Sequence, residues 1–187
     1  MHNFKMIHLG RVDQTLLQDL AQIDRQLNSQ DSEHALDATQ PVGIEGFYDQ
    51  LQLVQGARRV DVELAGIQGY LATLASERRQ LVGPVRLSWL APGASERRRV
   101  ADDDRVLYCL MLQGQRGMIA EIGDERIQMR PGELWQITQG DMLKMVNDSQ
   151  ESCVMLSVEL SVGLGLPQYQ GKVQRGAASW FPHALAG

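Results

Sequence analysis

The sequence lacks the residue types from which several classes of protein are built. Only two of its 187 residues are cysteines, Cys109 and Cys153, which excludes a disulfide scaffold and a four-cysteine zinc site. The 23 acidic residues outnumber the 18 basic ones, and the net charge of −5 argues against nucleic acid as a partner. No apolar run reaches the ~18 residues of a membrane-spanning helix, and the N-terminus lacks the apolar run of a signal peptide. We therefore expect a soluble cytoplasmic protein with no membrane partner.

The chain does contain an ordinary globular composition, with 43% hydrophobic and 22% charged residues. This length and composition predict a single domain over residues 1–187 that buries its own core. Three parts are expected within it: a mainly helical part over residues 1–84, a β-barrel core over residues 85–162 and an irregular tail over residues 163–187.

Two helices are expected in the N-terminal part. Asp13 is a suitable N-cap, and apolar side chains recur at steps of three and four through residues 14–27. The same spacing recurs in residues 60–80 and predicts a second helix there. The polar stretch over residues 28–46 predicts a loop between them.

From Val85 onward, the hydrophobic period changes to two, which is typical of half-buried strands. Glycine, proline and asparagine turn signals separate the strand candidates at short, regular spacing, and this pattern predicts an antiparallel sandwich or barrel. Seven segments fit the strand pattern: VRLSWL, VLYCLMLQ, MIAEIG, ERIQMR, LWQIT, MLKMVN and CVMLSVELSV.

Residues 132–160 of this β region resemble the aspartyl/asparaginyl β-hydroxylase family, whose members are enzymes that use iron and 2-oxoglutarate. The shared positions form a spaced set of polar, aromatic and glycine residues: Gly132, Glu133, Trp135, Asn147, Asp148 and Ser149. The segment LSWLAPGASERRRVA, upstream, resembles the same family. The resemblance implies an α+β fold in which N-terminal helices pack on a double-stranded β-helix, the cupin-like jelly roll.

The resemblance also implies an iron held by two histidines and a carboxylate, but the matching positions hold other residues. Arg99 and Leu143 stand where the family has its histidines, Ala101 where it has the acid, and Cys153 where it has the arginine that pairs with the co-substrate. A guanidinium is always protonated and a leucine has no lone pair, so neither can bind a metal. None of the four histidines falls on an expected strand: His2, His8, His34 and His183.

The same alignment gives eight candidates for lining a ligand pocket: Ser88, Arg99, Tyr108, Leu110, Leu143, Met145, Cys153 and Met155. Ser88 matches a family serine that touches the co-substrate. Arg99 is expected to point inward and to hold an anionic metabolite where the positive charge of iron was lost. The apolar character of most of the other candidates predicts an interior that is filled rather than open.

Two charge runs allow more than one interpretation. Arg97, Arg98 and Arg99 are typical of a charged surface loop, and they could also bind a phosphate or carboxylate. The run from Asp102 to Asp104 is typical of a solvated loop paired with those arginines, and it could also bind a hard cation. Cys109 and Cys153 fit buried structural positions better than a redox pair.

These observations favour a non-catalytic, metal-free relative of the β-hydroxylases that has no cofactor and binds a small anionic ligand or a protein partner. Two alternatives stay open. One is an active enzyme with a rearranged metal site or with metal-independent chemistry. The other is an assembly protein that forms a homodimer through its sheet edges or its tail.

Overall fold

A computed structural model describes residues 5–11, 16, 19–21, 42–55, 58–100, 105–114, 118–137 and 142–161. Within these ranges, the chain forms two antiparallel sheets, the helix α2 (Ala65–Arg78) and a short helical segment at residues 19–21. None of the described helical segments is long and apolar enough to cross a membrane.

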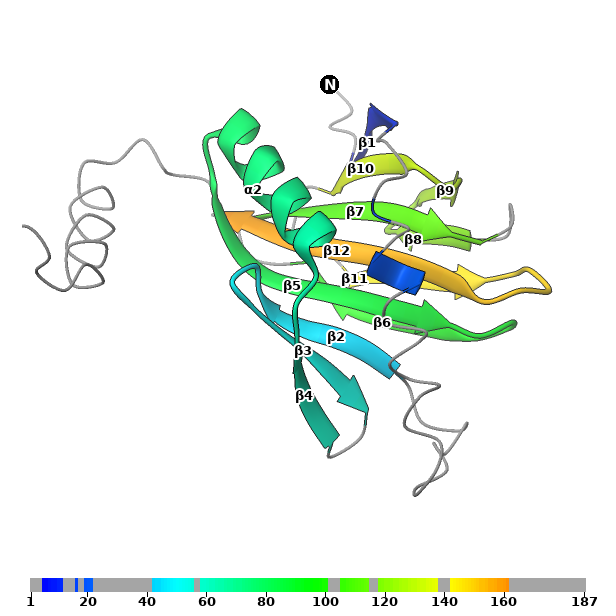
Figure 1. Cartoon of the computed structure of the whole chain (residues 1–187). Helices are drawn as coiled ribbons and strands as arrows, with labels where there is room; N and C mark the ends of the chain where they lie inside the picture. The colour runs from blue at the N-terminus through cyan, green and yellow to red at the C-terminus, as the bar shows by residue number, and fades with distance from the viewer. Residues whose placement is uncertain are drawn as a thin grey trace, which may run out of the picture.

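The large sheet has eight strands and the small sheet has four. In spatial order, the large sheet contains β1 (Met6–Arg11), β10 (Glu133–Ile137), β7 (Arg105–Gln113), β12 (Cys153–Ser161), β5 (Leu81–Leu90), β2 (Val42–Phe47), β3 (Gln50–Gln55) and β4 (Arg58–Val62). The small sheet contains β6 (Ser95–Arg99), β11 (Met142–Asn147), β8 (Met118–Ile122) and β9 (Glu125–Met129). Figure 1 shows the large sheet as the continuous layer beneath α2.

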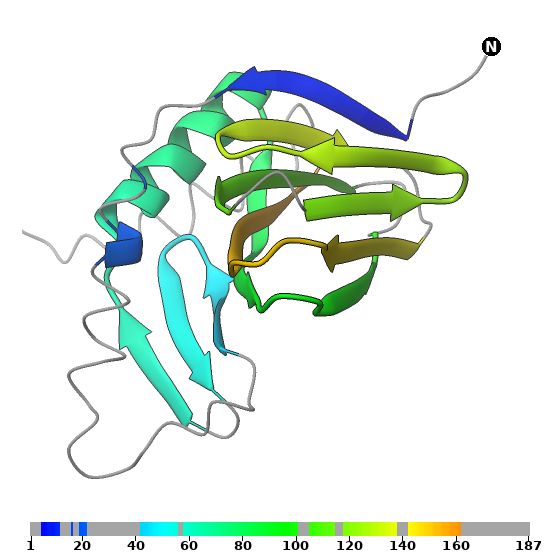
Figure 2. The same cartoon turned by 90° about the vertical axis from the view of Figure 1, so that its right-hand side faces the viewer.

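The two faces of the large sheet pack against different partners. Helix α2 covers one face, and the small sheet lies over part of the other, as Figure 2 shows. Strand β12 illustrates the alternation, because Leu156 and Val158 belong to the core under α2 whereas Cys153 and Met155 belong to the core between the sheets. The space between the two sheets is called the barrel interior below.

The first 84 residues differ from the sequence prediction, because four strands lie there. β1 to β4 extend the large sheet at its two edges, where helices and a loop were expected. Most of β2 lies in the polar stretch that predicted a loop over residues 28–46, and no element was predicted for β3, whose Leu51 and Leu53 are buried under α2. The expected helix over residues 60–80 is present but begins at Ala65. The other expected helix lies mostly outside the described residues, with Asp19–Ala21 helical.

A residue distant in sequence caps helix α2. The N-cap residue, Leu64, offers no side-chain hydrogen bond. Instead, the Asp19 carboxylate accepts a hydrogen bond of 2.6 Å from the Ile67 backbone N–H, and Asp19 is itself buried. A Cβ at Gly66 would lie 3.0 Å from the Asp19 Oδ2, so this close approach favours glycine. The cap therefore fastens the N-terminal segment to the helix.

All seven strands expected after Val85 are present, and the structure adds β6, which had been interpreted as a charged loop. The alternation in β6 is between exposed and partly buried side chains, all of them polar, so it carries no hydrophobic signal. The expected irregular tail over residues 163–187 lies outside the described residues.

Candidate functional site

The barrel interior is apolar and closely filled on the side of β7, β8 and β11. Its members are soft or aliphatic side chains from both sheets, each no more than 1% exposed: Cys109, Met111, Met118, Ala120, Ile122, Leu143, Met145, Cys153 and Met155. Methionine fills irregular space well because its chain is unbranched and flexible. These residues occupy the region to which the resemblance assigns the iron and the co-substrate.

The candidate pocket residues lie in three places: the barrel interior, the core under α2 and the exposed face of β6. Five of them face the barrel interior: Ser88, Leu143, Met145, Cys153 and Met155. Tyr108 and Leu110 belong to the core under α2, because on β7 it is Cys109 that points between the sheets. The Tyr108 hydroxyl accordingly donates to Gln80 Oε1 over 3.3 Å. Tyr108 and Leu110 therefore do not line the interior with the other five.

The expected inward direction of Arg99 is wrong by one residue. Arg99 is exposed on the outward face of β6, whereas Arg98 pairs in register with Leu143 and points inward. Because successive side chains of a strand face opposite ways, a shift of one position exchanges the two faces. Sequence reasoning missed Arg98 because the segment was interpreted as a loop, in which no alternation applies.

Arg98 is engaged by groups on β12. Its guanidinium donates to the Ser157 hydroxyl and, over 2.8 Å, to Glu159 Oε1. The Arg98 and Glu159 side chains are 14% and 12% exposed, so this ion pair is largely shielded from water. Glu159 also pairs with Arg105 over 3.3 Å. The inward arginine therefore already has carboxylate and hydroxyl partners within the chain.

A pocket opens on the other side of β6, where the small sheet ends above β5 and β2. Its volume is about 590 Å³, and we call it the seam pocket. The residues that line it come from β2, β3, β5 and β6 and from the turn that precedes β6: Gly43, Glu45, Val54, Arg86, Ser88, Trp89, Leu90, Ala94, Ser95, Glu96 and Arg97. Of these, only Ser88 was a candidate from the sequence.

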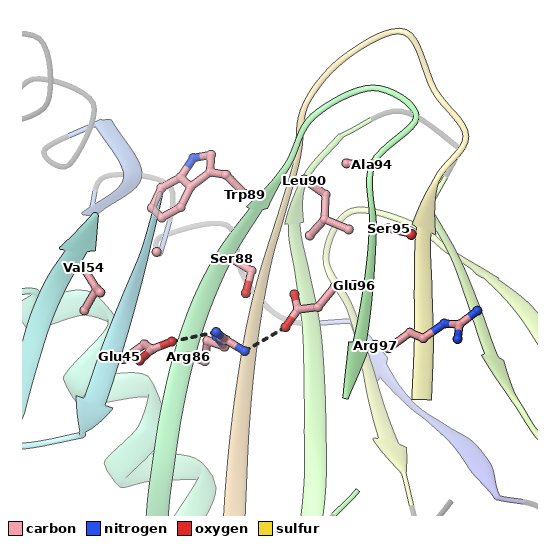
Figure 3. Close-up of a pocket in the computed structure, with 11 residues that line it drawn as sticks. Glu45, Val54, Arg86, Ser88, Trp89, Leu90, Ala94, Ser95, Glu96 and Arg97 are labelled. Carbon is pink, nitrogen blue, oxygen red and sulfur yellow. Dashed lines mark hydrogen bonds and ion pairs between the residues drawn. The ribbon is translucent and has the colours of Figure 1, made fainter. Parts of the chain in front are cut away.

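Arg86 is the central charged group of the seam pocket (Figure 3). Its guanidinium lies 2.7 Å from Glu45 Oε1 and 2.9 Å from Glu96 Oε1. Glu45 stands directly opposite Arg86 in the register of β2 and β5, whereas Glu96 comes from the small sheet. The arginine therefore links the two sheets across the pocket, with two carboxylates around one guanidinium.

The floor of the seam pocket is made by small residues. Gly43 stands opposite Ser88 in the register of β2 and β5. A Cβ at Gly43 would lie 3.0 Å from the Leu87 carbonyl oxygen, so the backbone itself forms this part of the floor. Beside it, the Ser157 hydroxyl donates to the Arg86 carbonyl oxygen over 3.3 Å. Ser88 lines the same pocket as the three charged groups, and Figure 3 shows its side chain among them.

The residues on which the resemblance to the β-hydroxylases was based shape turns. The Glu133 carboxylate accepts hydrogen bonds from the Arg130 backbone N–H over 3.0 Å and from the Trp135 indole N–H over 3.3 Å. The Asn147 amide donates to the carbonyl oxygens of Leu90 and Glu151, both over 2.8 Å. The shared motif thus stabilises the turn before β10 and the connection from β11 to β12. It indicates fold rather than chemistry.

The side chains around the interior do not fit the iron that the resemblance implies. Among the described residues, no three histidine, cysteine, aspartate or glutamate side chains are grouped to hold a metal ion. His8, on β1, packs its ring against Trp135 with centroids 4.9 Å apart. Leu143 and the inward Arg98 offer no lone pair to a metal.

The two thiols are also poor reactive groups. Burial raises the pKa of Cys109 to about 12, with Glu96 adding to the effect and Arg98 opposing it. Burial likewise raises the pKa of Cys153, which the contact with the Ser149 hydroxyl partly offsets. Both thiols therefore stay protonated near neutral pH, and a thiolate nucleophile is not available.

No protein-family model and no curated protein matches the sequence. Solved structures of double-stranded β-helix and cupin proteins resemble it. A cupin domain of an XRE family transcriptional regulator from Enterobacter cloacae has a TM-score of 0.37 at 16% identity, over 41% of this chain and 78% of that one. A double-stranded β-helix protein from Klebsiella pneumoniae has a TM-score of 0.38 at 15% identity, over 46% and 78%.

A prolyl-4-hydroxylase from Pseudomonas putida matches more of the chain. The TM-score is 0.54 at 16% identity, and the match covers 85% of this chain and 93% of that one. At this identity the likeness extends to the fold and no further. With its two facing antiparallel sheets, the chain is a protein of double-stranded β-helix fold.

Proposed function

We propose that the chain is a non-catalytic double-stranded β-helix protein that works without iron and binds a small polar ligand in the seam pocket. The packing of the barrel interior carries this proposal. Leu143, Met145, Cys153 and Met155 are at most 1% exposed and leave their apolar side chains where an iron enzyme needs ligands and an open coordination position. Filling such a region with apolar groups stabilises the fold, because unpaired polar groups there would be costly.

The charges of the seam pocket favour a ligand that donates hydrogen bonds. Glu45 and Glu96 both lie against Arg86, so the three groups together carry one excess negative charge. Arg97 also lines the pocket, but its side chain points away from these three groups in Figure 3. An anion would have to compete with these two carboxylates for the same guanidinium. A polar molecule that carries an amine gains instead from both carboxylates and from the Ser88 hydroxyl. The ligand class proposed here therefore differs from the anionic metabolite expected at Arg99.

Iron and 2-oxoglutarate test the first half of the proposal, since the fold is shared with a prolyl-4-hydroxylase. A ligand that binds only the folded state raises stability by about 2.7 kcal/mol at a hundredfold excess over its dissociation constant. We expect no rise in the unfolding temperature of the purified protein with Fe(II) and 2-oxoglutarate, together or singly. About one iron per chain on elemental analysis, or uncoupled turnover of 2-oxoglutarate, would contradict the proposal.

A metal-independent enzyme is the second candidate. The observation in its favour is that Glu45 and Glu96 approach one guanidinium from two sheets, next to the hydroxyl of Ser88. Such carboxylates can serve as acid and base. Once an amine ligand is identified by a screen on thermal stability, Glu96→Gln separates the two candidates. Chemical change of the ligand by the parent protein, lost in Glu96→Gln while binding persists, supports the enzyme.

A further inference from the structure

The outward face of the small sheet is basic, although the whole chain carries a net charge of −5. The charged side chains that point outward from its four strands are four basic residues and one acidic residue: Arg97 and Arg99 on β6, Lys144 on β11, Arg126 on β9 and Glu121 on β8. This face therefore differs in sign from the chain as a whole. Such a patch attracts an anionic partner.

The single acidic residue, Glu121, forms ion pairs with the basic residues of β9 and β11 and with neither arginine of β6. Glu121 lies 3.0 Å from the Lys144 Nζ and 3.5 Å from the Arg126 Nε. The hydrogen bond from Lys144 is the largest cause that holds the pKa of the Glu121 carboxyl below its usual value, and the positive charges of Lys144 and Arg126 add to it. Arg97 and Arg99 are exposed, and no described residue forms an ion pair with either of them. Two guanidinium groups two residues apart are thus left for an outside partner.

β6 is also an edge strand. It pairs with β11 on one side, and on its other side no described strand follows it. The seam pocket runs beside residues 94–97, so space is present along this edge. In Figure 3, Glu96 points into the pocket and Arg97 points away from it. An extended chain added here would therefore continue the small sheet, with its side chains alternating between the pocket and the basic outer face.

We propose that the free edge of β6 docks an extended acidic segment of a partner protein, which adds to the small sheet as a further strand. Carboxylates at every second position of that segment would lie beside Arg97 and Arg99 as cross-strand pairs of opposite charge. The residues between them would face the seam pocket and Glu96, which favours small polar or basic side chains there. This surface goes beyond the ligand proposed for the pocket, because the arginines that select the segment point outward, although its intervening side chains share the pocket.

Two labelled peptides of equal composition test the pattern by fluorescence anisotropy. One alternates glutamate with threonine, and the other holds the same glutamates in one block. We expect the alternating peptide to bind at least about tenfold more tightly, and its binding to protect the amides of residues 95–99 from hydrogen exchange. Arg97→Gln with Arg99→Gln should weaken it by about tenfold, which corresponds to about 1.4 kcal/mol. The control, Arg126→Gln with Arg130→Gln, makes the same charge change at the opposite edge and should alter binding less than about twofold.

Several results would overturn the proposal. Equal binding of the two peptides, equal loss in the two double variants, or equally tight binding of a single-stranded oligonucleotide would mean a general attraction of polyanions. The acidic run from Asp102 to Asp104 follows β6 in the sequence and could itself compete. Tighter peptide binding by a variant with all three changed to asparagine supports the docking surface. No binding by either the parent protein or that variant refutes it.

Discussion

The two faces of the large sheet use the same strands to build two different cores. Under α2, the side chains are aliphatic and include leucines from both the helix and the strands, such as Leu71, Leu110 and Leu156. In the barrel interior, methionine and cysteine replace them, as at Met111, Met155 and Cys153. Branched aliphatic side chains have few rotamers and define a docking position, whereas methionine adapts to irregular space. The aliphatic core thus fixes the position of α2 on the large sheet, whereas the methionine-rich core fills the irregular space between the two sheets.

A second difference lies within the interior itself. Around β7, β8 and β11 it is apolar, whereas along β5, β6 and β12 it holds charged groups in pairs. Arg86 and Glu96, and Arg98 and Glu159, each join β6 to the large sheet. Along β6, ion pairs therefore join the two sheets where apolar contacts join them elsewhere in the interior. This is where the seam pocket opens.

The largest expected effect tests whether the barrel interior is packed as tightly as the core under α2. Leu143→Ala and Leu156→Ala remove comparable side chains from the two cores, and both residues are at most 1% exposed. Each change should lower the free energy of unfolding by about 2–5 kcal/mol in denaturant titrations. Leu143→Met keeps the volume and should cost less than about 1.5 kcal/mol. A nearly neutral Leu143→Ala would mean that this position lines an open pocket, and the comparison of two filled cores would fail.

The next effect separates the two faces of β6. Arg98→Met removes the charged hydrogen bonds to Ser157 and Glu159, and should lower the free energy of unfolding by about 1.5–3 kcal/mol. Arg99→Met, its neighbour on the exposed face, should change it by less than about 0.5 kcal/mol. The reverse order in thermal or denaturant melts would restore Arg99 as the inward residue and Arg98 as the outward one.

Local pattern made most of the barrel predictable. In β12, strict alternation of apolar side chains with softer ones identified both the strand and its two faces, since Leu156 and Met155 do face opposite cores. The turns were predictable too, because Glu133 contacts Arg130 and Asn147 contacts Ser149, both close in sequence, although Asn147 also reaches the distant Leu90. The pattern of residues 85–162 alone therefore predicted an antiparallel sandwich or barrel, and the double-stranded β-helix was expected only from the resemblance to the β-hydroxylases.

The seam pocket could not be predicted, because its charged groups are distant in the sequence. Glu45 meets Arg86 only because β2 pairs with β5, and β2 was expected to be a loop. Glu96 joins them only because β6 folds over from the other sheet. In a wholly polar segment such as SERRR, hydrophobic periodicity predicts neither that a strand forms nor which side chains point inward. Arg99 was misplaced for this reason, whereas Arg86, on a predicted strand, was missed because both of its carboxylate partners come from segments expected to be loops.

The smallest effect concerns pH and uses the buried thiol of the interior. Burial raises the pKa of Cys109 from 9.0 to about 12, so above pH 9 the unfolded chain loses a proton that the folded chain keeps. The unfolded state then binds fewer protons, and the free energy of unfolding falls as pH rises, by up to about 1.4 kcal/mol per pH unit from this thiol. This contribution is fully present below pH 9 and is lost as the pH approaches 12. Tyr70, whose pKa burial also raises to about 12, adds a similar decline that begins one unit higher.

Cys109→Val isolates the part that comes from the thiol. Between pH 8 and pH 10, the parent protein should lose about 1.4 kcal/mol more than the variant, because Tyr70 and the remaining groups titrate alike in both. Urea titrations at several pH values measure the difference directly, whatever the variant's stability at neutral pH. Parallel curves for the two proteins would mean that the Cys109 thiol ionises in the folded state at its ordinary pKa. Water would then reach the barrel interior, and the methionine-rich side would be the looser of the two cores.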